Sequence, residues 1–96
     1  MPALLRAQRT GEKASRVGFE WDTLDEIKAK VIEEINEFLE IDINDKENLE
    51  DEFGDVLFAL TQVARRLTLD SEKALHGATD KFTRRFQELE KRAGKP

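Results

Sequence analysis

Residues 22–41 read DTLDEIKAKVIEEINEFLEI. Apolar side chains recur in this stretch every three or four residues, which is the period of an amphipathic α-helix. Thr23 and Glu26 have the spacing of a capping box, so the helix should begin there and run to about Ile41. The apolar stripe consists of Leu24, Ile27, Val31, Ile35 and Phe38. Glu34 lies at the border of this stripe, and we therefore expect its carboxylate to be partly buried.

The helical period continues on both sides of this segment and predicts three further helices. They extend from Pro2 to about Ser15, from Lys46 or Glu47 to Leu67, and from the cap Asp70 to just before Ala93. Short connections at 42–46 and 68–70 favour antiparallel neighbours. The sequence thus predicts an all-α fold, a four-helix antiparallel bundle-like protomer. It forms one domain over residues 1–96 with a frayed tail at about 93–96.

The predicted core of this bundle consists of apolar residues from the third and fourth helices. These residues are Phe53, Val56, Leu60, Phe82 and Phe86. A chain of 96 residues buries a limited fraction of its surface and is only marginally stable alone. We therefore expect association of the chain with copies of itself.

Composition excludes several classes of partner and site. The net charge is −5, which disfavours contact with a nucleic-acid backbone because such contact requires a basic patch. The chain has no Cys and one His, so thiolate and multi-His metal sites are excluded. No apolar run is long enough to span a membrane, and the N-terminus has no apolar signal core. We expect a cytoplasmic protein that contacts neither membrane nor nucleic acid.

Acidic residues are concentrated in the middle of the chain. Eleven of the 21 lie between Glu33 and Asp55, in the two sets Glu33-Glu34-x-x-Glu37 and Glu52-x-x-Asp55. Each set has helical spacing and should present its carboxylates on one face. A solvated face is the alternative interpretation of either set alone, but two sets on neighbouring helices favour a seat for hard divalent cations such as Mg²⁺. Burying these charges without a cation would be unfavourable.

Other metal sites do not fit the spacing. An EF-hand loop beginning at Asp42 would need Gly and Glu where Glu47 and Phe53 stand. A di-iron bundle needs Glu-x-x-His pairs, but Lys73 lies three residues before His76. These two alternative metal sites are therefore excluded by their spacing.

Three further side chains could serve a phosphate-bearing substrate. Lys81 and Arg85 are four residues apart on one helical face and could supply positive charge to phosphate oxygens. Trp21 could stack on a base or anchor a core or dimer interface.

The acidic sets also resemble a known family. Lys30-Val-Ile-Glu33-Glu34-Ile-Asn-Glu37, followed by Glu52-Phe-Gly-Asp55-Val-Leu-Phe, resembles the MazG nucleoside triphosphate pyrophosphohydrolases. Arg16-Val-Gly-Phe-Glu-Trp21 and Ala78-Thr-Asp-Lys81-Phe-Thr-Arg-Arg85-Phe are similar to segments of the same family. The resemblance covers the chain from about Pro2 to Glu90 and is greatest to the catalytic C-terminal half of two-domain members.

This resemblance implies an all-α fold that forms a homodimer or higher homo-oligomer as a larger helical bundle. It implies Mg²⁺-dependent hydrolysis of a nucleoside triphosphate between the α- and β-phosphates, with Mn²⁺ as a possible substitute, in nucleotide-pool housecleaning. The implied metal ligands, or partners of such ligands, are Glu33, Glu34, Glu37, Glu52 and Asp55. Among them we expect Glu34 and Glu37 to be catalytic, since a glutamate not fully committed to metal can orient or deprotonate a water. The implied phosphate contacts are Lys30, Lys81 and Arg85, and we expect Trp21 to be a further substrate-binding residue because its ring could stack on a base.

Alternatives remain open at several of these positions. Lys30 could instead pair with Glu34, four residues on. Thr79 stands where many relatives have Asn, which leaves one polar substrate contact open. The whole chain could also be a non-catalytic MazG-like dimer that binds nucleotide or a protein partner, or a structural acidic bundle without a ligand.

Overall fold

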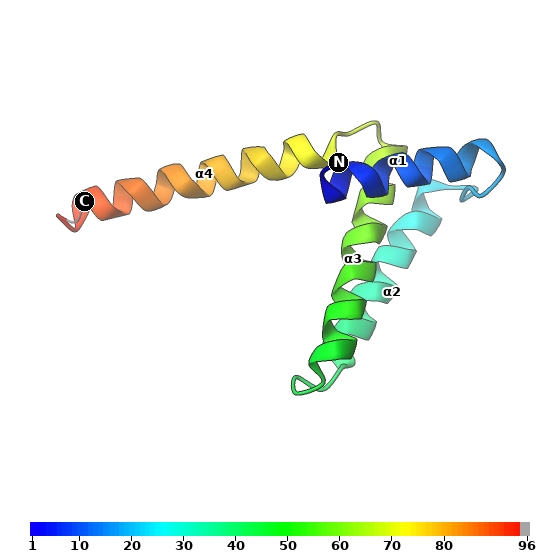
Figure 1. The fold of residues 1–96 in the computed structure, drawn as a ribbon, viewed down its shortest axis with the longest axis horizontal. Coiled ribbons are helices and arrows are strands. Elements are labelled where there is room, and N and C mark those ends of the chain that lie inside the picture. The colour runs from blue at the N-terminus through cyan, green and yellow to red at the C-terminus, as the bar shows by residue number, and fades with distance from the viewer. Residues whose placement is uncertain (95–96) are drawn as a thin grey trace.

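The computed structural model describes residues 1–94 and consists of four helices (Figure 1). They are α1 (Ala3–Arg16), α2 (Leu24–Glu40), α3 (Lys46–Arg66) and α4 (Ser71–Arg92), and the described part contains no strand. The predicted all-α fold is confirmed, and each helix begins and ends within two residues of its expected bounds. Of the tail expected at 93–96, residues 95–96 lie outside the described part. None of the helices within residues 1–94 has the length and apolar character needed to cross a membrane.

Side chains cap the helices where the sequence predicts it. The Thr23 hydroxyl accepts a hydrogen bond from the Glu26 N–H at 3.2 Å, and the Glu26 carboxylate accepts one from the Asp22 N–H at 3.1 Å. The predicted capping box therefore forms, with Asp22 as the donor of its returning bond. Asp70 caps α4 by accepting from the Lys73 N–H at 3.0 Å, as expected.

The packed part of the molecule is the pair of helices α2 and α3, with α1 lying across α3 (Figure 1). Ile27 of α2 is 1% exposed, and Val56 and Ala59 of α3 are also buried. The five residues between α2 and α3 return the chain at once, so the two helices lie antiparallel and side by side. This seam contains most of the apolar core.

The fourth helix does not complete a bundle within one chain. None of its residues is buried, and it makes no contact with α2. The radius of gyration is 17.0 Å, whereas a compact chain of this length has a value of about 12 Å. The antiparallel packing predicted across 68–70 is therefore not formed, and α4 extends away from the other helices (Figure 1).

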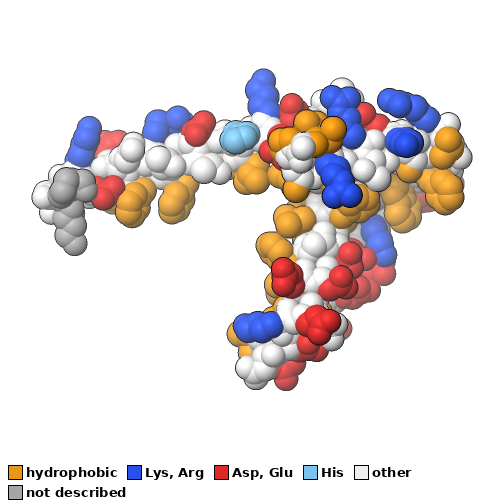
Figure 2. Space-filling view, in the orientation of Figure 1, with side chains coloured by type: hydrophobic (Ala, Val, Ile, Leu, Met, Phe, Trp, Pro, Cys, Tyr) orange, Lys and Arg blue, Asp and Glu red, His pale blue; other side chains and the backbone are white. Residues whose placement is uncertain are grey.

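The extension of α4 changes the expected core. Val56 is buried as predicted, but Phe53, Leu60, Phe82 and Phe86 are 50%, 47%, 70% and 52% exposed. These four assignments are wrong for the single chain, because α4 extends away from α2 and α3 instead of packing along them (Figure 1). Figure 2 shows hydrophobic side chains along the edges of α3 and α4 that border the open angle between them.

Hydrogen bonds between α1 and the start of α4 hold the corner at which α4 leaves. The Gln8 amide donates to the Leu69 carbonyl and accepts from the Ser71 N–H at 3.1 Å and hydroxyl at 2.6 Å. A Glu72 carboxylate oxygen accepts from the Leu4 N–H at 2.9 Å and from the next N–H at 3.3 Å. Glu72 thus caps α1, which has no capping side chain of its own. We call these contacts the corner latch.

Replacement of Glu72 should weaken this corner. Glu72→Ala leaves the first N–H groups of α1 without an acceptor, so the free energy of unfolding should fall by about 1 kcal/mol. Urea denaturation measures the change. Glu88→Ala, on the exposed part of the same helix, is the matched control and should change stability by less than half as much. Equal effects of the two substitutions would show that the cap contributes nothing.

Candidate metal centre

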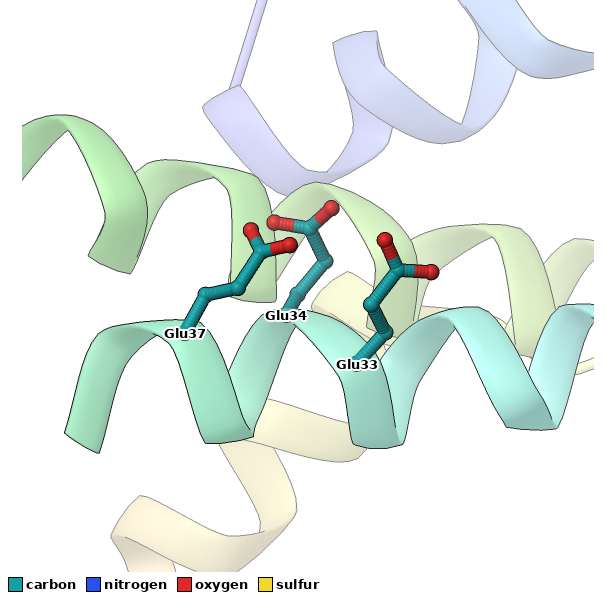
Figure 3. Close-up of side chains that lie close together, drawn as sticks. All are labelled: Glu33, Glu34 and Glu37. Atoms are coloured by element: carbon teal, nitrogen blue, oxygen red, sulfur yellow. The ribbon is translucent and has the colours of Figure 1, made fainter. Parts of the chain in front are cut away.

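Five carboxylates converge on one flank of the α2–α3 seam. Glu33, Glu34 and Glu37 leave the same side of α2 (Figure 3) and offer ligand oxygens within 4.8 Å of one another. Glu34 does the same with Glu52 and Asp55 of α3. The structure therefore brings together the two acidic sets recognised in the sequence, and Glu34 belongs to both groups.

The centre of this cluster is buried and lacks hydrogen-bond donors. Glu34 is 7% exposed, which confirms the burial expected from its place beside the apolar stripe. Glu34 Oε2 and Glu52 Oε1 are buried and have no hydrogen-bond partner. Two acceptor oxygens in this state need a proton or a cation between them. An all-oxygen donor set of this kind fits a hard divalent cation.

The close approach of the buried carboxylates also changes their pKa values. The neighbouring Glu34 carboxylate, followed by burial and by Glu37, raises the pKa of Glu52 to about 8. The pKa of Glu34 is lowered, first because Glu52, when protonated, can donate a hydrogen bond to it, and then because Lys30 does so. Without a metal, the pair thus retains one proton near neutral pH, on Glu52. A bound cation would displace this proton, as is usual when carboxylates become ligands.

Lys30 is the cation nearest to the acids. Its Nζ lies 2.9 Å from Glu34 Oε1 and 3.5 Å from Glu33 Oε1. The hydrogen bond to Glu34 raises the pKa of Lys30. The structure therefore forms the i, i+4 pair that was the alternative role for this residue. Phosphate contact by Lys30 stays a prediction.

A pocket of about 300 Å³ opens beside the carboxylates. Its polar side is formed by Lys30, Glu34 and Asp55, and its other side includes Trp21 and Phe58. Trp21 is 40% exposed, so its ring is accessible at the pocket. The structure places this aromatic residue near the acids, and its predicted stacking on a base is not tested by this arrangement.

The remaining two predicted substrate contacts lie elsewhere. Lys81 and Arg85 belong to α4, which points away from α2 and shares no contact with it. Within one chain the structure does not bring them to the acidic cluster. Their contact with phosphate stays a prediction.

Sequence reasoning missed several residues around the pocket. Phe58 and Gln62 line it, and Glu20 is paired with Arg65 and Arg66 close by. In the sequence, the only indication of this pairing is that Arg65 and Arg66 carry charges opposite to that of Glu20. Opposite charges alone are a weak indication of contact. Because 45 positions separate Glu20 from Arg65, no helical period relates them.

Comparisons with known proteins agree with the geometry. Residues 22–89 match the family described as MazG nucleotide pyrophosphohydrolase domain. The chain is 44% identical over 94 residues to the nucleoside triphosphate pyrophosphohydrolase of Escherichia coli K12, covering 95% of this chain and 36% of that protein. It is 43% identical over 90 residues to the nucleoside triphosphate pyrophosphohydrolase/pyrophosphatase MazG of Thermotoga maritima, covering 94% of this chain and 34% of that protein. The chain thus spans about a third of the length of these curated relatives.

The carboxylate pair predicts how stability depends on pH in the metal-free protein. The pKa of Glu52 is about 8 in the folded chain, against an ordinary value of 4.5. Between these values the folded state binds more protons than the unfolded state, so raising the pH favours unfolding. The pKa of Glu34 is lowered from 4.5, so this residue changes the stability only below pH 4.5, where raising the pH favours the folded state. The melting temperature in EDTA should therefore fall as pH rises from about 5 to about 8.

Glu52→Gln should flatten this profile, because the amide cannot lose the proton. Glu50→Gln, two residues away at an exposed position of α3, is the control and should keep the wild-type slope. A Glu52→Gln profile as steep as that of the wild type would contradict the assignment of the shared proton to Glu52.

Proposed function

Because this chain belongs to the MazG nucleotide pyrophosphohydrolase family, we propose that it hydrolyses nucleoside triphosphates to nucleoside monophosphates and pyrophosphate. Such an activity would serve nucleotide-pool housecleaning. The observation that best supports it is the convergence of five carboxylates on one seam, two of them with buried oxygens that lack a partner. Both relatives described above are named nucleoside triphosphate pyrophosphohydrolases, which supports a reaction of this class.

The acidic cluster would hold Mg²⁺, for which Mn²⁺ could substitute. The ligands would be drawn from Glu33, Glu34, Glu37, Glu52 and Asp55. A bound divalent cation neutralises phosphate charge and lowers the pKa of water. Lys30 would add a positive charge by moving from Glu34 to a phosphate oxygen.

Glu34 and Glu37 are the residues that would act on the attacking water. A carboxylate near this water orients it and accepts its proton as general base. The water oxygen forms a bond to the α-phosphorus, and the bond from that phosphorus to the α–β bridging oxygen breaks. Pyrophosphate leaves with the bridging oxygen, and the nucleoside monophosphate keeps the oxygen of water.

The active form would be a homodimer or a higher homo-oligomer, in which a second copy supplies α4. Three observations support this. The apolar residues Phe82 and Phe86 of α4 are exposed, the corner latch directs α4 away from its own acids, and Lys81 and Arg85 complement a strongly acidic cluster. Lys81 and Arg85 would then contact the phosphates bound at the partner's carboxylates.

The reaction is tested by its products. With Mg²⁺ and a panel of nucleoside triphosphates, we expect a nucleoside monophosphate and pyrophosphate, resolved by ion-exchange chromatography. Glu37→Gln should lower kcat/KM roughly 100-fold or more, because general-base and ligand functions are both lost. Glu40→Gln, one turn further along α2 and outside the cluster, is the matched control and should retain activity.

Two outcomes would contradict this assignment. Release of inorganic phosphate and a nucleoside diphosphate would show that another bond is cleaved. An unchanged rate in Glu37→Gln would remove that residue from the site. If Mg²⁺ raises the melting temperature while no nucleotide is turned over, the chain is a non-catalytic binding module.

The contribution of α4 in trans is tested with mixed dimers. Glu37→Gln and the double variant Lys81→Ala/Arg85→Ala should each be nearly inactive alone. When the two chains are co-expressed with different tags and purified over both, each dimer contains one complete site, so about half of the wild-type activity should return. Activity no higher than that of the separate variants would show that α4 acts within its own chain or not at all.

A further inference from the structure

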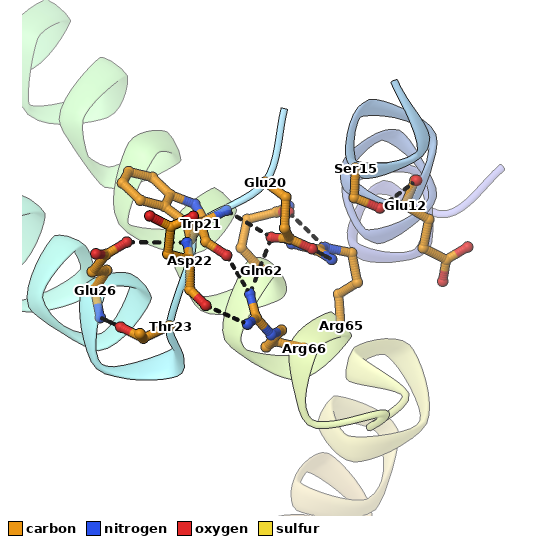
Figure 4. Close-up of polar contacts among 10 residues, drawn as sticks. All are labelled: Glu12, Ser15, Glu20, Trp21, Asp22, Thr23, Glu26, Gln62, Arg65 and Arg66. Atoms are coloured by element: carbon orange, nitrogen blue, oxygen red, sulfur yellow. Dashed lines mark hydrogen bonds and ion pairs between the residues drawn. The ribbon is translucent and has the colours of Figure 1, made fainter. Parts of the chain in front are cut away.

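The segment between α1 and α2 crosses the end of α3 and is held there by charge. We call residues 18–22 the strap. Its Glu20 carboxylate accepts two hydrogen bonds from Arg65, Nη1 to Oε2 and Nη2 to Oε1, both at 2.8 Å (Figure 4). The Arg65 side chain is 9% exposed. A bidentate pair with an enclosed guanidinium is among the stronger ionic contacts in proteins.

The neighbouring arginine holds the strap by its backbone. Arg66 donates to the Trp21 carbonyl at 2.7 Å and to the Asp22 carbonyl at 3.1 Å, and it lies 3.3 Å from Glu20 Oε1. Glu20 Oε1 also accepts the Trp21 N–H at 2.9 Å. We call Glu20, Arg65 and Arg66 the clamp. Together the three residues fix the backbone on both sides of the Trp21 ring.

A second pocket lies between α1, the strap and α3. Its volume is about 420 Å³, and its walls include Phe19, Trp21 and Phe58. Trp21, Phe58 and Gln62 line both this pocket and the one beside the carboxylates. The two spaces are therefore adjacent, and Trp21 stands at their junction.

The walls of the second pocket suit a flat, uncharged group. Gly11 and Ala14 of α1 contribute almost no side chain to it, and three aromatic rings form part of its wall. Glu20 and Arg65 also line it, and their charges are paired with each other. A Cβ at Gly11 would collide with the Gln62 amide, so Gly11 lets α1 approach α3 closely here. Base–aromatic stacking is a common way of holding a planar heterocycle in such a space.

We propose that the second pocket receives the nucleoside end of the substrate whose phosphates lie at the acidic cluster, and that Glu20, Arg65 and Arg66 are positioning residues that hold Trp21 for this contact. The proposal rests on the proposed function for the reaction itself. It assigns the clamp a role in recognition, because none of the three residues belongs to the carboxylate cluster.

The clamp and the carboxylate cluster share no residue, so loss of the clamp should affect substrate binding more than the chemical step. Loss of the clamp frees the strap and its tryptophan but leaves the carboxylates in place. Glu20→Gln should therefore raise KM about tenfold, comparable with the loss of one stacking contact, while kcat stays within about twofold of wild type. The KM of the double variant Glu20→Gln/Arg65→Gln should be no higher than that of the more impaired single variant, because either change alone already breaks the Glu20–Arg65 pair.

Binding can be followed without turnover, because Trp21 is the one tryptophan of the chain. The four common nucleoside triphosphates should quench its fluorescence in the wild type. Inorganic tripolyphosphate, which has the phosphates but no nucleoside, should inhibit with the same constant in wild type and Glu20→Gln and should not quench. Arg9→Gln is the matched control, since it breaks the exposed Arg9–Glu12 pair of 3.7 Å on α1.

Three results would overturn the proposal. One is equal quenching by tripolyphosphate and nucleotides, and another is an unchanged KM and unchanged quenching in Glu20→Gln. The third is a parallel rise of KM and of the tripolyphosphate inhibition constant, which would make the clamp a structural support only. Absence of turnover in the wild type would refute the proposed reaction, and the fluorescence titrations would still decide whether the pocket binds a nucleoside.

Discussion

The packing of α2 against α3 is the constraint on which the rest of the molecule depends. It buries Ile27 and Val56, and the same register buries Glu34 against Glu52. Like charges in this position are tolerated because a proton stays on Glu52 and Lys30 pairs with Glu34. A cation would relieve the repulsion further, so the seam that forms the core also places these carboxylates where a metal ion could stabilise them.

Helical periodicity is local, and this is why the sequence predicts so much of the seam. The spacing within Glu33–Glu37 and within Glu52–Asp55 defines one face of each helix. The five residues between α2 and α3 leave little choice but antiparallel packing, which sets the two faces against each other. No comparable local rule exists for α4. Its direction depends on Gln8 and Glu72, which bond to residues more than 60 positions away.

The wrong core assignments have the same origin. Phe82 and Phe86 have the period of a buried stripe, and a stripe indicates only that some surface will cover it. Sequence periodicity does not show whether that surface belongs to the same chain. The clamp was missed because its ion pairs join the strap to the C-terminal end of α3, 45 positions away in the sequence. Such pairs form only after the helices have packed, and no local pattern predicts them.

The carboxylates lie on α2 and α3, whereas the basic residues Lys81 and Arg85 lie on α4. Because of this separation, binding of a phosphate-bearing substrate would depend on assembly of the protein. In one chain the carboxylates are accompanied by Lys30 alone among the predicted phosphate contacts, and its ammonium is already paired with Glu33 and Glu34. A triphosphate approaching this surface meets net negative charge, which repels it. Lys81 and Arg85 lie on a helix that has no buried residue and exposes the rings of Phe82 and Phe86, so the contacts that would drive association are the same ones that would deliver positive charge. Assembly and competence for a polyanionic substrate would then be one equilibrium, and dilution of the protein would lower both together.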